Sequence, residues 1–254
     1  TDFELMGMSG NNVKILLDGI PLIDRGATKQ SLSQLDVNST ERVEIVEGPM
    51  SVVYGTDALA GVINIITKKG DGYSEENTWR VGARVQEESM GKEYDFFKDK
   101  GLHNESIDLG FNHKSGLFVN GGYTRNNHGG WQGDLTGREK RWHPKDQALM
   151  NGMFGFQNRN MNVWYRLDFL DEKIFGPNNG SELQPEKVSD KDFLTKRYTH
   201  QLQSDWKLDN RLDVHAALSY QDYKRRTRTT ESDLSTGEKW LSSAEASQDI
   251  TQYK

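Results

Sequence analysis

Residues 41–69 read ERVEIVEGPMSVVYGTDALAGVINIITKK, and this stretch decides the fold of the first part of the chain. Charged and aliphatic residues alternate from Glu41 to Val46, a period of two that is typical of a half-buried strand. Gly48-Pro49 interrupts the alternation. The aliphatic run Val62–Ile66 then predicts a strand that is buried on both faces. By pattern alone, the stretch indicates a small α+β domain with no evident chemistry.

The residues upstream extend this pattern. Val13–Leu17 (VKILL) predicts a short apolar strand, and Asp18-Gly19 predicts a turn after it. Together with Met6-Gly7-Met8, residues 5–69 resemble, without a gap, the second half of the plug domain of TonB-dependent outer-membrane receptors. The resemblance is to the cobalamin, catecholate-siderophore and colicin I receptors. It implies an α+β plug inside the lumen of a membrane barrel, and we call residues 1–70 the plug segment.

Residues 71–254 make the case for a barrel independently. Seven candidate strands of ten to fourteen residues are longer than is usual in soluble sheets and fit tilted membrane-spanning strands. Their connections are alternately long and short, as in an outer-membrane barrel whose long loops are extracellular. The candidate strands are Trp79–Glu88, Glu105–Lys114, Leu117–Asn126, Gln147–Gln157, Met161–Asp171, Arg197–Leu208 and Arg211–Lys224. The long loops between them are Ser89–Asn104, Asn127–Asp146 and Glu172–Lys196.

Apolar and polar side chains alternate within these strands. In Met161–Asp171, the odd-numbered residues up to Phe169 are apolar, whereas the other face carries Asn162, Trp164, Arg166 and Asp168. A soluble sandwich permits the same alternation, but the strand lengths favour a barrel. A plugged barrel needs about 22 strands. We therefore expect a mainly β fold, a transmembrane antiparallel β-barrel of which residues 71–254 form only the first seven or eight strands, around an α+β plug.

Composition agrees with a barrel and excludes several other classes of protein. Mean hydropathy is −0.81 and no apolar run approaches the ~18 residues of a transmembrane helix, yet the chain has 10 Phe, 6 Trp and 9 Tyr. The net charge of −6 argues against nucleic-acid binding. The lack of cysteine excludes a disulfide scaffold and a thiolate metal site. Because both ends look cut, with no signal peptide, we expect a segment of a longer protein.

No catalytic constellation is found, because G-x-S-x-G, P-loop and H-E-x-x-H motifs are all missing from the sequence. We therefore expect no enzyme activity, no cofactor and no metal site. The six histidines are never spaced i,i+3 or i,i+4, which favours solvated loop histidines over a haem or metal site. An acidic cluster leaves calcium binding open, although its spacing does not match an EF-hand. Its members are Asp171, Glu172, Glu182, Glu186, Asp190 and Asp192.

Two regions are candidates for ligand contact. The resemblance implies that the loop after the Asp18-Gly19 turn rises to the extracellular pocket as an apex of the plug. In this chain that loop carries two cations, which suit an anionic ferric catecholate, and two side chains that offer hydrogen bonds. A second loop places a tryptophan among glycines, where it is able to stack on a ligand. The predicted ligand-binding residues are Arg25, Thr28, Lys29, Gln30 and Trp131; ordinary solvated loop residues are the alternative.

The contact between plug and barrel departs from the family pattern. Family plugs carry an arginine in each of two motifs, and glutamates of the barrel wall hold both arginines. This chain has Met6 and Glu47 at those positions, so the family's ion pairs do not carry over. A buried Glu47 would need a basic or hydrogen-bonding partner, and the lumen-facing candidates are Arg80, Arg84 and Arg166. The alternatives are a partner on strands beyond this chain, or a hydrated Glu47 in the gap between plug and wall.

These inferences predict an outer-membrane receptor of a Gram-negative bacterium, which captures a scarce nutrient and imports it into the periplasm with energy from TonB. The resemblance implies that TonB binds a segment preceding this chain. The expected ligand is a ferric siderophore, with cobalamin or haem as alternatives, and outer-membrane lipid surrounds the barrel. Rivals from other classes are a non-transporting surface barrel, such as an adhesin, and a soluble β-rich binding domain.

Overall fold

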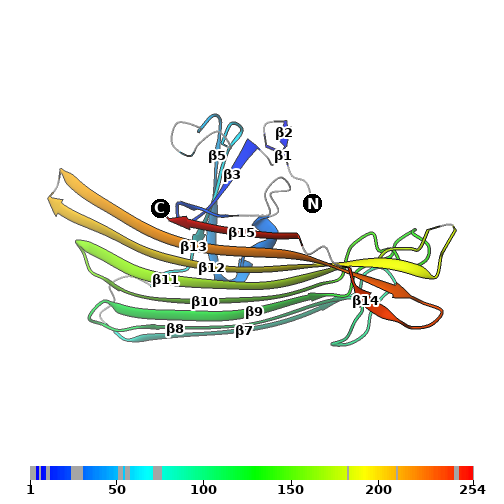
Figure 1. The fold of residues 1–254 in the computed structure, drawn as a ribbon. Helices are drawn as coiled ribbons and strands as arrows, with labels where there is room; N and C mark the ends of the chain where they lie inside the picture. The colour runs from blue at the N-terminus through cyan, green and yellow to red at the C-terminus, as the bar shows by residue number, and fades with distance from the viewer. Residues whose placement is uncertain are drawn as a thin grey trace.

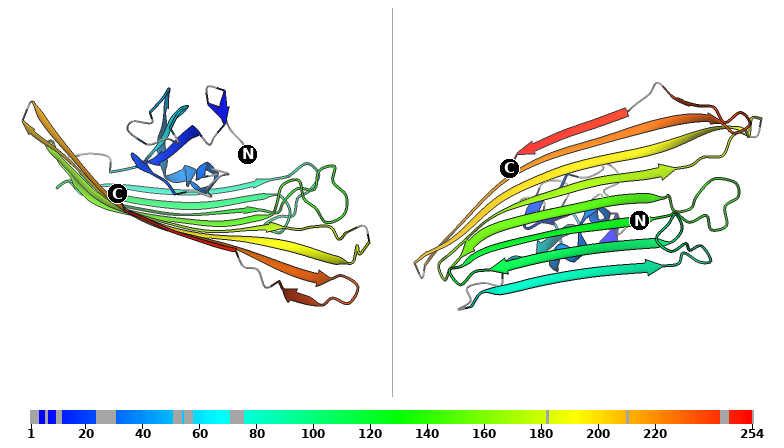
Figure 2. Two further views of the ribbon diagram at one scale, coloured as in Figure 1. Left: turned by 45° about the horizontal axis from the view of Figure 1, so that its top comes forward. Right: turned by 90° about the horizontal axis from the view of Figure 1, so that it is seen from below.

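The computed structural model describes residues 4–5, 7–9, 12–23, 31–50, 54, 58–70, 76–181, 183–209, 211–242 and 246–253. A broad, curved antiparallel sheet, which we call the wall, carries a small sheet of the plug segment on its concave side (Figure 1 and Figure 2). Within the described residues, no helix is long and apolar enough to cross a membrane. The fold is mainly β, as the sequence predicted.

The small sheet has the strand order β4-β3-β6-β5, in which β3 and β6 are parallel neighbours and the other pairs are antiparallel. The strands predicted around the Gly48-Pro49 break are therefore present. The bounds of its elements are β3 (Val13–Leu17), β4 (Ile20–Pro21), β5 (Thr40–Glu47) and β6 (Gly61–Thr67). Beside it lie a two-stranded ladder of β1 (Glu4–Leu5) and β2 (Met8–Ser9), and the 3-10 helices η3 (Ser31–Gln34) and η4 (Val37–Ser39).

The core of the plug segment is formed by β3 and β6, whose aliphatic residues are almost all buried, as predicted for β6. Strand β5 differs from its prediction of half burial, because Val43 and Ile45 are 51% and 56% exposed. Among the described strands β5 pairs only with β6, so it is an edge strand that no second layer covers. The alternation identified the strand correctly but not its surroundings.

The wall is a meander in which each strand from β7 to β13 pairs antiparallel with the next, and β14 and β15 both pair with β13. All seven strands predicted from the sequence are present, and short turns alternate with longer connections as expected. Their bounds are β7 (Thr78–Glu88), β8 (Leu102–Asn112), β9 (Leu117–His128), β10 (Lys145–Gln157), β11 (Met161–Gly176), β12 (Lys187–Asp209), β13 (Leu212–Asp233), β14 (Lys239–Leu241) and β15 (Ala246–Tyr253).

One long loop was placed wrongly. The predicted loop Glu172–Lys196 is mostly strand, because β11 continues to Gly176 and β12 already begins at Lys187, with sixteen consecutive register partners between them. In these extensions both faces carry charged and polar residues, so the period-two signal disappears although the backbone ladder continues. Hydrophobic alternation reports which face meets lipid or a core, and not where backbone pairing stops.

The burial of the wall is the reverse of that in a soluble protein. On its convex face, Trp79, Val81 and Leu218 are 76%, 71% and 64% exposed. On the concave face, Gln201 and Gln221 are 0% and 1% exposed, under the plug segment. A soluble sandwich would bury the aliphatic face and hydrate the polar one. The inverted pattern belongs to a membrane barrel with a filled lumen, which excludes the sandwich alternative.

Candidate functional site

The seam between the plug segment and the wall is the most elaborate polar region of the described residues. Its first component is a set of four wall glutamines whose side-chain amides bind the plug backbone. All four glutamines lie on the polar face of their strands, which is the concave face of the wall. The donor–acceptor distances run from 2.7 to 3.3 Å. The pairs are Gln147 with Ser33, Gln201 with Leu17, Gln203 with Asp18, and Gln221 with both Pro21 and Ile23.

These amides bind backbone groups around the β3–β4 turn, at and after the end of β4, and in η3. Gln221 donates to the carbonyl of Pro21 at 2.7 Å and accepts from the amide of Ile23 at 3.1 Å. A buried backbone group that lost such a partner would cost about 1–3 kcal/mol. Because every one of these bonds is to backbone, the four glutamines recognise the course of the plug chain and not its side chains.

The second component of the seam is Asp36, the N-cap of η4. Its Oδ1 accepts from the backbone amide of Asn38 and from Thr124 Oγ1, both at 3.0 Å. Its Oδ2 accepts from Asn151 Nδ2 at 3.2 Å. Asn38 Nδ2 in turn donates to Thr124 Oγ1 at 3.2 Å. A single plug carboxylate thereby joins the start of a helix to two neighbouring wall strands.

Buried wall arginines form the third component. Arg166 on β11 is 2% exposed; it binds Asp168 and donates from Nη2 to Ser39 Oγ at 3.3 Å. Asp18 and Asp36 are the next carboxylates that act on this guanidinium. Arg197 on β12 donates from Nη2 to the carbonyl of Gln34 at 2.9 Å. Here the wall supplies cations and the plug supplies acceptors.

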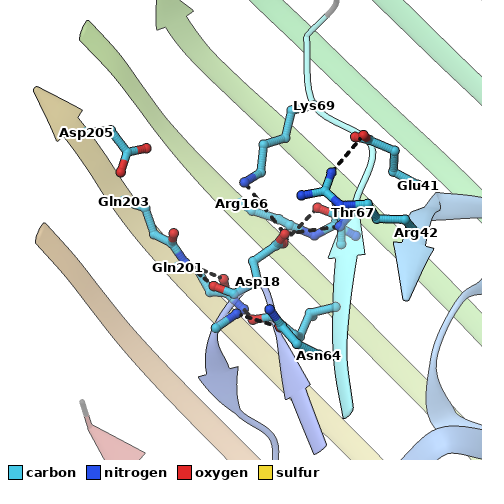
Figure 3. A network of polar contacts seen from close by, with 12 residues as sticks. Asp18, Glu41, Arg42, Asn64, Thr67, Lys69, Arg166, Gln201, Gln203 and Asp205 are labelled. Atoms are coloured by element: carbon cyan, nitrogen blue, oxygen red, sulfur yellow. Dashed lines mark hydrogen bonds and ion pairs between the residues drawn. The ribbon is translucent and has the colours of Figure 1, made fainter. Parts of the chain in front are cut away.

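Figure 3 shows the network around Asp18, at the turn between β3 and β4. Its carboxylate accepts from the amide of Thr67 at 3.0 Å and from Thr67 Oγ1 at 2.7 Å, and Lys69 Nζ lies 3.7 Å away. Lys69 also lies over the ring of Trp164, 4.7 Å from its centroid. Asp18 thus ties the β3–β4 turn to the end of β6, and its own carbonyl accepts from Gln203 at 2.8 Å.

The predicted plug–barrel residues are distributed unevenly over this seam. Arg166 contacts the plug. Arg84 lines a cavity of about 220 Å³ with Asp36, and Arg80 lies 3.8 Å from Asp108 beside a smaller cavity. Glu47 is not brought to any of them: it is exposed at the end of edge strand β5, in register with Gly61. The carboxylates at the seam are Asp18, Asp36 and Glu172 instead.

Sequence reasoning missed the glutamines, Asp36 and Arg197. One signal was available, because Gln201, Gln203 and Gln221 all occupy the polar face of strands whose other face is apolar. Polar residues such as glutamine are expected on the lumen face of any barrel, so their position alone does not predict that they bind a plug. Asp36 carried an N-cap signal, since it precedes η4 directly.

The predicted ligand residues lie in two places. Arg25, Thr28, Lys29 and Gln30 fall outside the described residues. Trp131 lies in the loop between β9 and β10, where its backbone exchanges two hydrogen bonds with Trp142 at 2.9 and 3.0 Å. The two indole rings are 5.3 Å apart, and Trp142 is 51% exposed. The loop therefore presents a small aromatic platform instead of a single free ring.

The charged residues of the outer loops are largely paired with one another. Arg138 binds both carboxylate oxygens of Asp190, at 3.1 and 2.7 Å, and Arg228 donates to Asp192 at 2.7 Å. A hydrogen bond from its own backbone amide and the guanidinium of Arg141 hold the pKa of Asp134 below its usual value. No group of three or more metal-binding side chains is found among the described residues. Of the acidic cluster, Asp171, Asp190 and Asp192 form ion pairs, whereas Glu172 accepts hydrogen bonds from Gln34 and Gln147.

Comparison with known proteins shows what the plug segment is similar to. Residues 1–62 match the family model described as TonB-dependent Receptor Plug Domain. The iron-regulated outer membrane virulence protein of Vibrio cholerae is 39% identical over 80 residues, which is 27% of this chain and 12% of that protein. The vitamin B12 transporter BtuB of Vibrio vulnificus is 39% identical over 79 residues, 31% of this chain and 13% of that protein. The chain thus matches about an eighth of the length of these relatives.

Solved structures extend the likeness of fold to the wall. The copper transporter OprC superimposes with a TM-score of 0.57 at 12% identity, over 99% of this chain and 44% of that chain. A structure of the FpvAI–pyocin S2 complex gives a TM-score of 0.53 at 15% identity, over 98% of this chain and 38% of that chain. At such identities the likeness concerns the fold alone. It places plug segment and wall strands in one known architecture.

Proposed function

Because the chain belongs to the TonB-dependent receptors, we propose that the whole protein is an outer-membrane receptor that captures a scarce nutrient and imports it into the periplasm. TonB supplies the energy in this proposal. BtuB and OprC are named as transporters, the Vibrio cholerae relative is named as an outer membrane protein, and none of the three is named as an enzyme. The Gram-negative outer membrane is the location that goes with this family.

One observation carries the proposal: the plug segment is held to the wall by discrete polar contacts. The glutamines, Arg197 and Asp36 bind their partners by hydrogen bonds. Because water replaces each bond when it breaks, a neutral one is worth only about 1 kcal/mol net and a charged one about 1.5–3 kcal/mol. An apolar core between plug and wall would resist separation in water. A polar seam supports a plug that moves and returns, which import requires and adhesion does not.

A ferric siderophore is the proposed ligand. Arg25 and Lys29 would meet its anionic oxygens, Thr28 and Gln30 would donate or accept hydrogen bonds, and the platform around Trp131 would stack on an aromatic part of the ligand. The relation to an iron-regulated protein supports this choice.

Cobalamin is the second candidate, because the relation to the vitamin B12 transporter has the same identity, 39%. A corrinoid is large and nearly neutral, so it would depend on Trp131 and hydrogen bonds more than on Arg25 and Lys29. Haem is a further possibility within the family. The two cations of the plug loop therefore distinguish an anionic iron chelate from cobalamin.

Growth of a deletion strain tests the proposal directly. The strain is supplied with ferric catecholates, cobalamin or haem as the limiting nutrient, and is complemented with the intact gene. Restored growth on one nutrient, lost again in a strain without TonB, is the expected result. Surface binding without uptake would favour an adhesin, and growth independent of TonB would contradict energy coupling.

A further inference from the structure

The convex face of the wall changes from apolar to charged along one line. On β11 its residues are apolar from Met161 to Phe169, about 26 Å of strand, and the next residue on that face is Asp171. The same position is charged on most neighbours, and the residues form one continuous register from β8 to β13. The members of this boundary row are Glu105, Arg125, Ala148, Asp171, Lys196 and Lys224.

The boundary row marks the outer edge of the hydrocarbon layer. An apolar band about 25 Å tall, edged by aromatic residues, is the mark of a membrane barrel. Phe169 and Tyr198 lie just inside the row, in register with each other and with ring centroids 4.8 Å apart. Side chains of the boundary row therefore stand at the depth of lipid headgroups, on the face opposite to the lumen.

Three cations gather where the row reaches β12 and β13. Lys196 and Lys224 are direct register partners, and their side chains are 58% and 52% exposed. Arg226 is exposed on the same face, two residues farther out on β13. Like charges directly opposite each other on adjacent strands are destabilising, so this arrangement requires an anion close by.

The charges of Lys196 and Lys224 are partly neutralised by carboxylates beside them in the wall. Asp171 lies 3.2 Å from Lys196, and Asp222 lies 3.2 Å from Lys224. Both ion pairs are at the surface, where each contributes less than about 1 kcal/mol. β15 adds Asp249 in register with Lys224. The lysines therefore remain available to a stronger anion that approaches from the membrane.

Arg226 has no such compensation. Its register neighbours are Leu194 on β12 and Ser247 on β15, neither of which carries a charge. Among the described residues, no carboxylate forms an ion pair with it. It is the outermost of the three cations. Farther out on the same face, Asp192 is already paired with Arg228 at 2.7 Å.

We propose that Lys196, Lys224 and Arg226 bind a phosphate of an outer-leaflet lipid. The convex face meets only membrane and water, so a nutrient bound in the lumen cannot reach it. Neighbouring side chains lie about 5 Å apart across the strands and about 7 Å apart along them, a spacing that lets several cations share one phosphate. The inference rests on the outer-membrane location in the proposed function, but not on which nutrient is transported.

The test uses the intact receptor purified in a neutral detergent and titrated with diphosphoryl lipid A, with bound lipid measured by native mass spectrometry. The triple variant K196Q/K224Q/R226Q removes all three charges and leaves a polar, somewhat shorter side chain at each position. Because a basic residue near an anionic lipid surface contributes about 1 kcal/mol, less where carboxylates are adjacent, we expect the dissociation constant to rise about tenfold or more. Nutrient binding by the variant should not change.

The control variant is K114Q/K207Q/R211Q, which removes the same number of exposed charges at the short-turn rim of the wall. It should bind lipid A as the wild type does. Equal loss in both variants, or undiminished binding by the first, would overturn the proposal. Inorganic phosphate at the same concentration should bind far more weakly; equal binding would make this a free-anion site and overturn its assignment to lipid. Loss of nutrient binding alone would concern the proposed function only.

Discussion

The guanidinium of Arg197 donates to the backbone carbonyl of Gln34 at 2.9 Å and to that of Ile23 at 3.2 Å, joining the wall to two separate parts of the plug segment. Arg197 is 5% exposed, so these carbonyls replace the water that a charge needs. Gln34 also donates to Glu172 at 3.0 Å, which places a carboxylate in the same buried group. The plug segment therefore completes the solvation of a wall cation while the cation holds the plug.

Replacing Arg197 should loosen the seat of the plug. An Arg197→Met change leaves two buried carbonyls without their donor and Glu172 without its nearest buried cation. Removing one member of a buried charged group typically costs about 3–5 kcal/mol. We expect faster amide hydrogen exchange in residues 12–23 and 31–40 of the intact receptor, and Arg211→Met at the exposed rim should leave that exchange unchanged. Equal exchange in the Arg197 variant and the wild type would contradict the role given to this residue.

Two carboxylates of the plug segment should differ in how much they contribute to holding the plug on the wall. Asp36→Ala removes an N-cap and the acceptor for Thr124 and Asn151, so it should weaken the seat by about 1–3 kcal/mol. Glu47→Ala, on the exposed edge strand, should change stability by less than about 0.5 kcal/mol. Limited proteolysis of the plug in the intact receptor measures both. The assignment of the seam to Asp36 would be wrong if Glu47→Ala released the plug more readily.

Gln221 allows a test of backbone recognition without any change of charge. Gln221→Met has nearly the same shape but removes both the donor to Pro21 and the acceptor from Ile23. The amide of Ile23 should then exchange about five- to 150-fold faster, since about 1–3 kcal/mol is lost when buried groups are left unpaired. Gln184→Met, at an exposed loop position, is the matched control and should exchange as the wild type does. An unchanged Ile23 amide would mean that water replaces the side chain at no cost.

The strands of the wall could be predicted from the sequence because alternate residues meet lipid. Met161 to Phe169 shows this directly, since every second residue there is apolar and lies on the convex face, although Trp164 on the concave face is apolar as well. The outer halves of β12 and β13 could not be predicted, because both faces carry charged and polar residues and the sequence shows no period of two. The burial of β5 was overestimated for a related reason: the alternation of Val43 and Ile45 does not say whether a second layer exists to cover them.

The seam could be predicted only in outline. Arg166 was recognisable as a charge on a lumen face, and the structure brings it to Ser39. Its expected partner, Glu47, was chosen by its place in a family motif. The motif does not show that β5 is an edge strand, on which Glu47 is exposed to solvent. Pairs such as Gln203 with Asp18, 185 residues apart, depend on how two parts of the chain dock, which no local pattern records.

The last prediction concerns Trp131 and the ligand. If the indole stacks on an aromatic nutrient, Trp131→Ala should raise the dissociation constant about three- to tenfold, the equivalent of about 0.5–1.5 kcal/mol for an aromatic pair. Trp131→Phe keeps a ring over the same position and should restore most of the affinity. Trp79→Phe on the convex face is the control, since that residue meets lipid and should not affect binding. Because the backbones of residues 131 and 142 exchange two hydrogen bonds, the hydrogen exchange of these two amides serves to show that the loop keeps its shape. An alanine variant with native exchange at these amides and native affinity would remove Trp131 from the binding site.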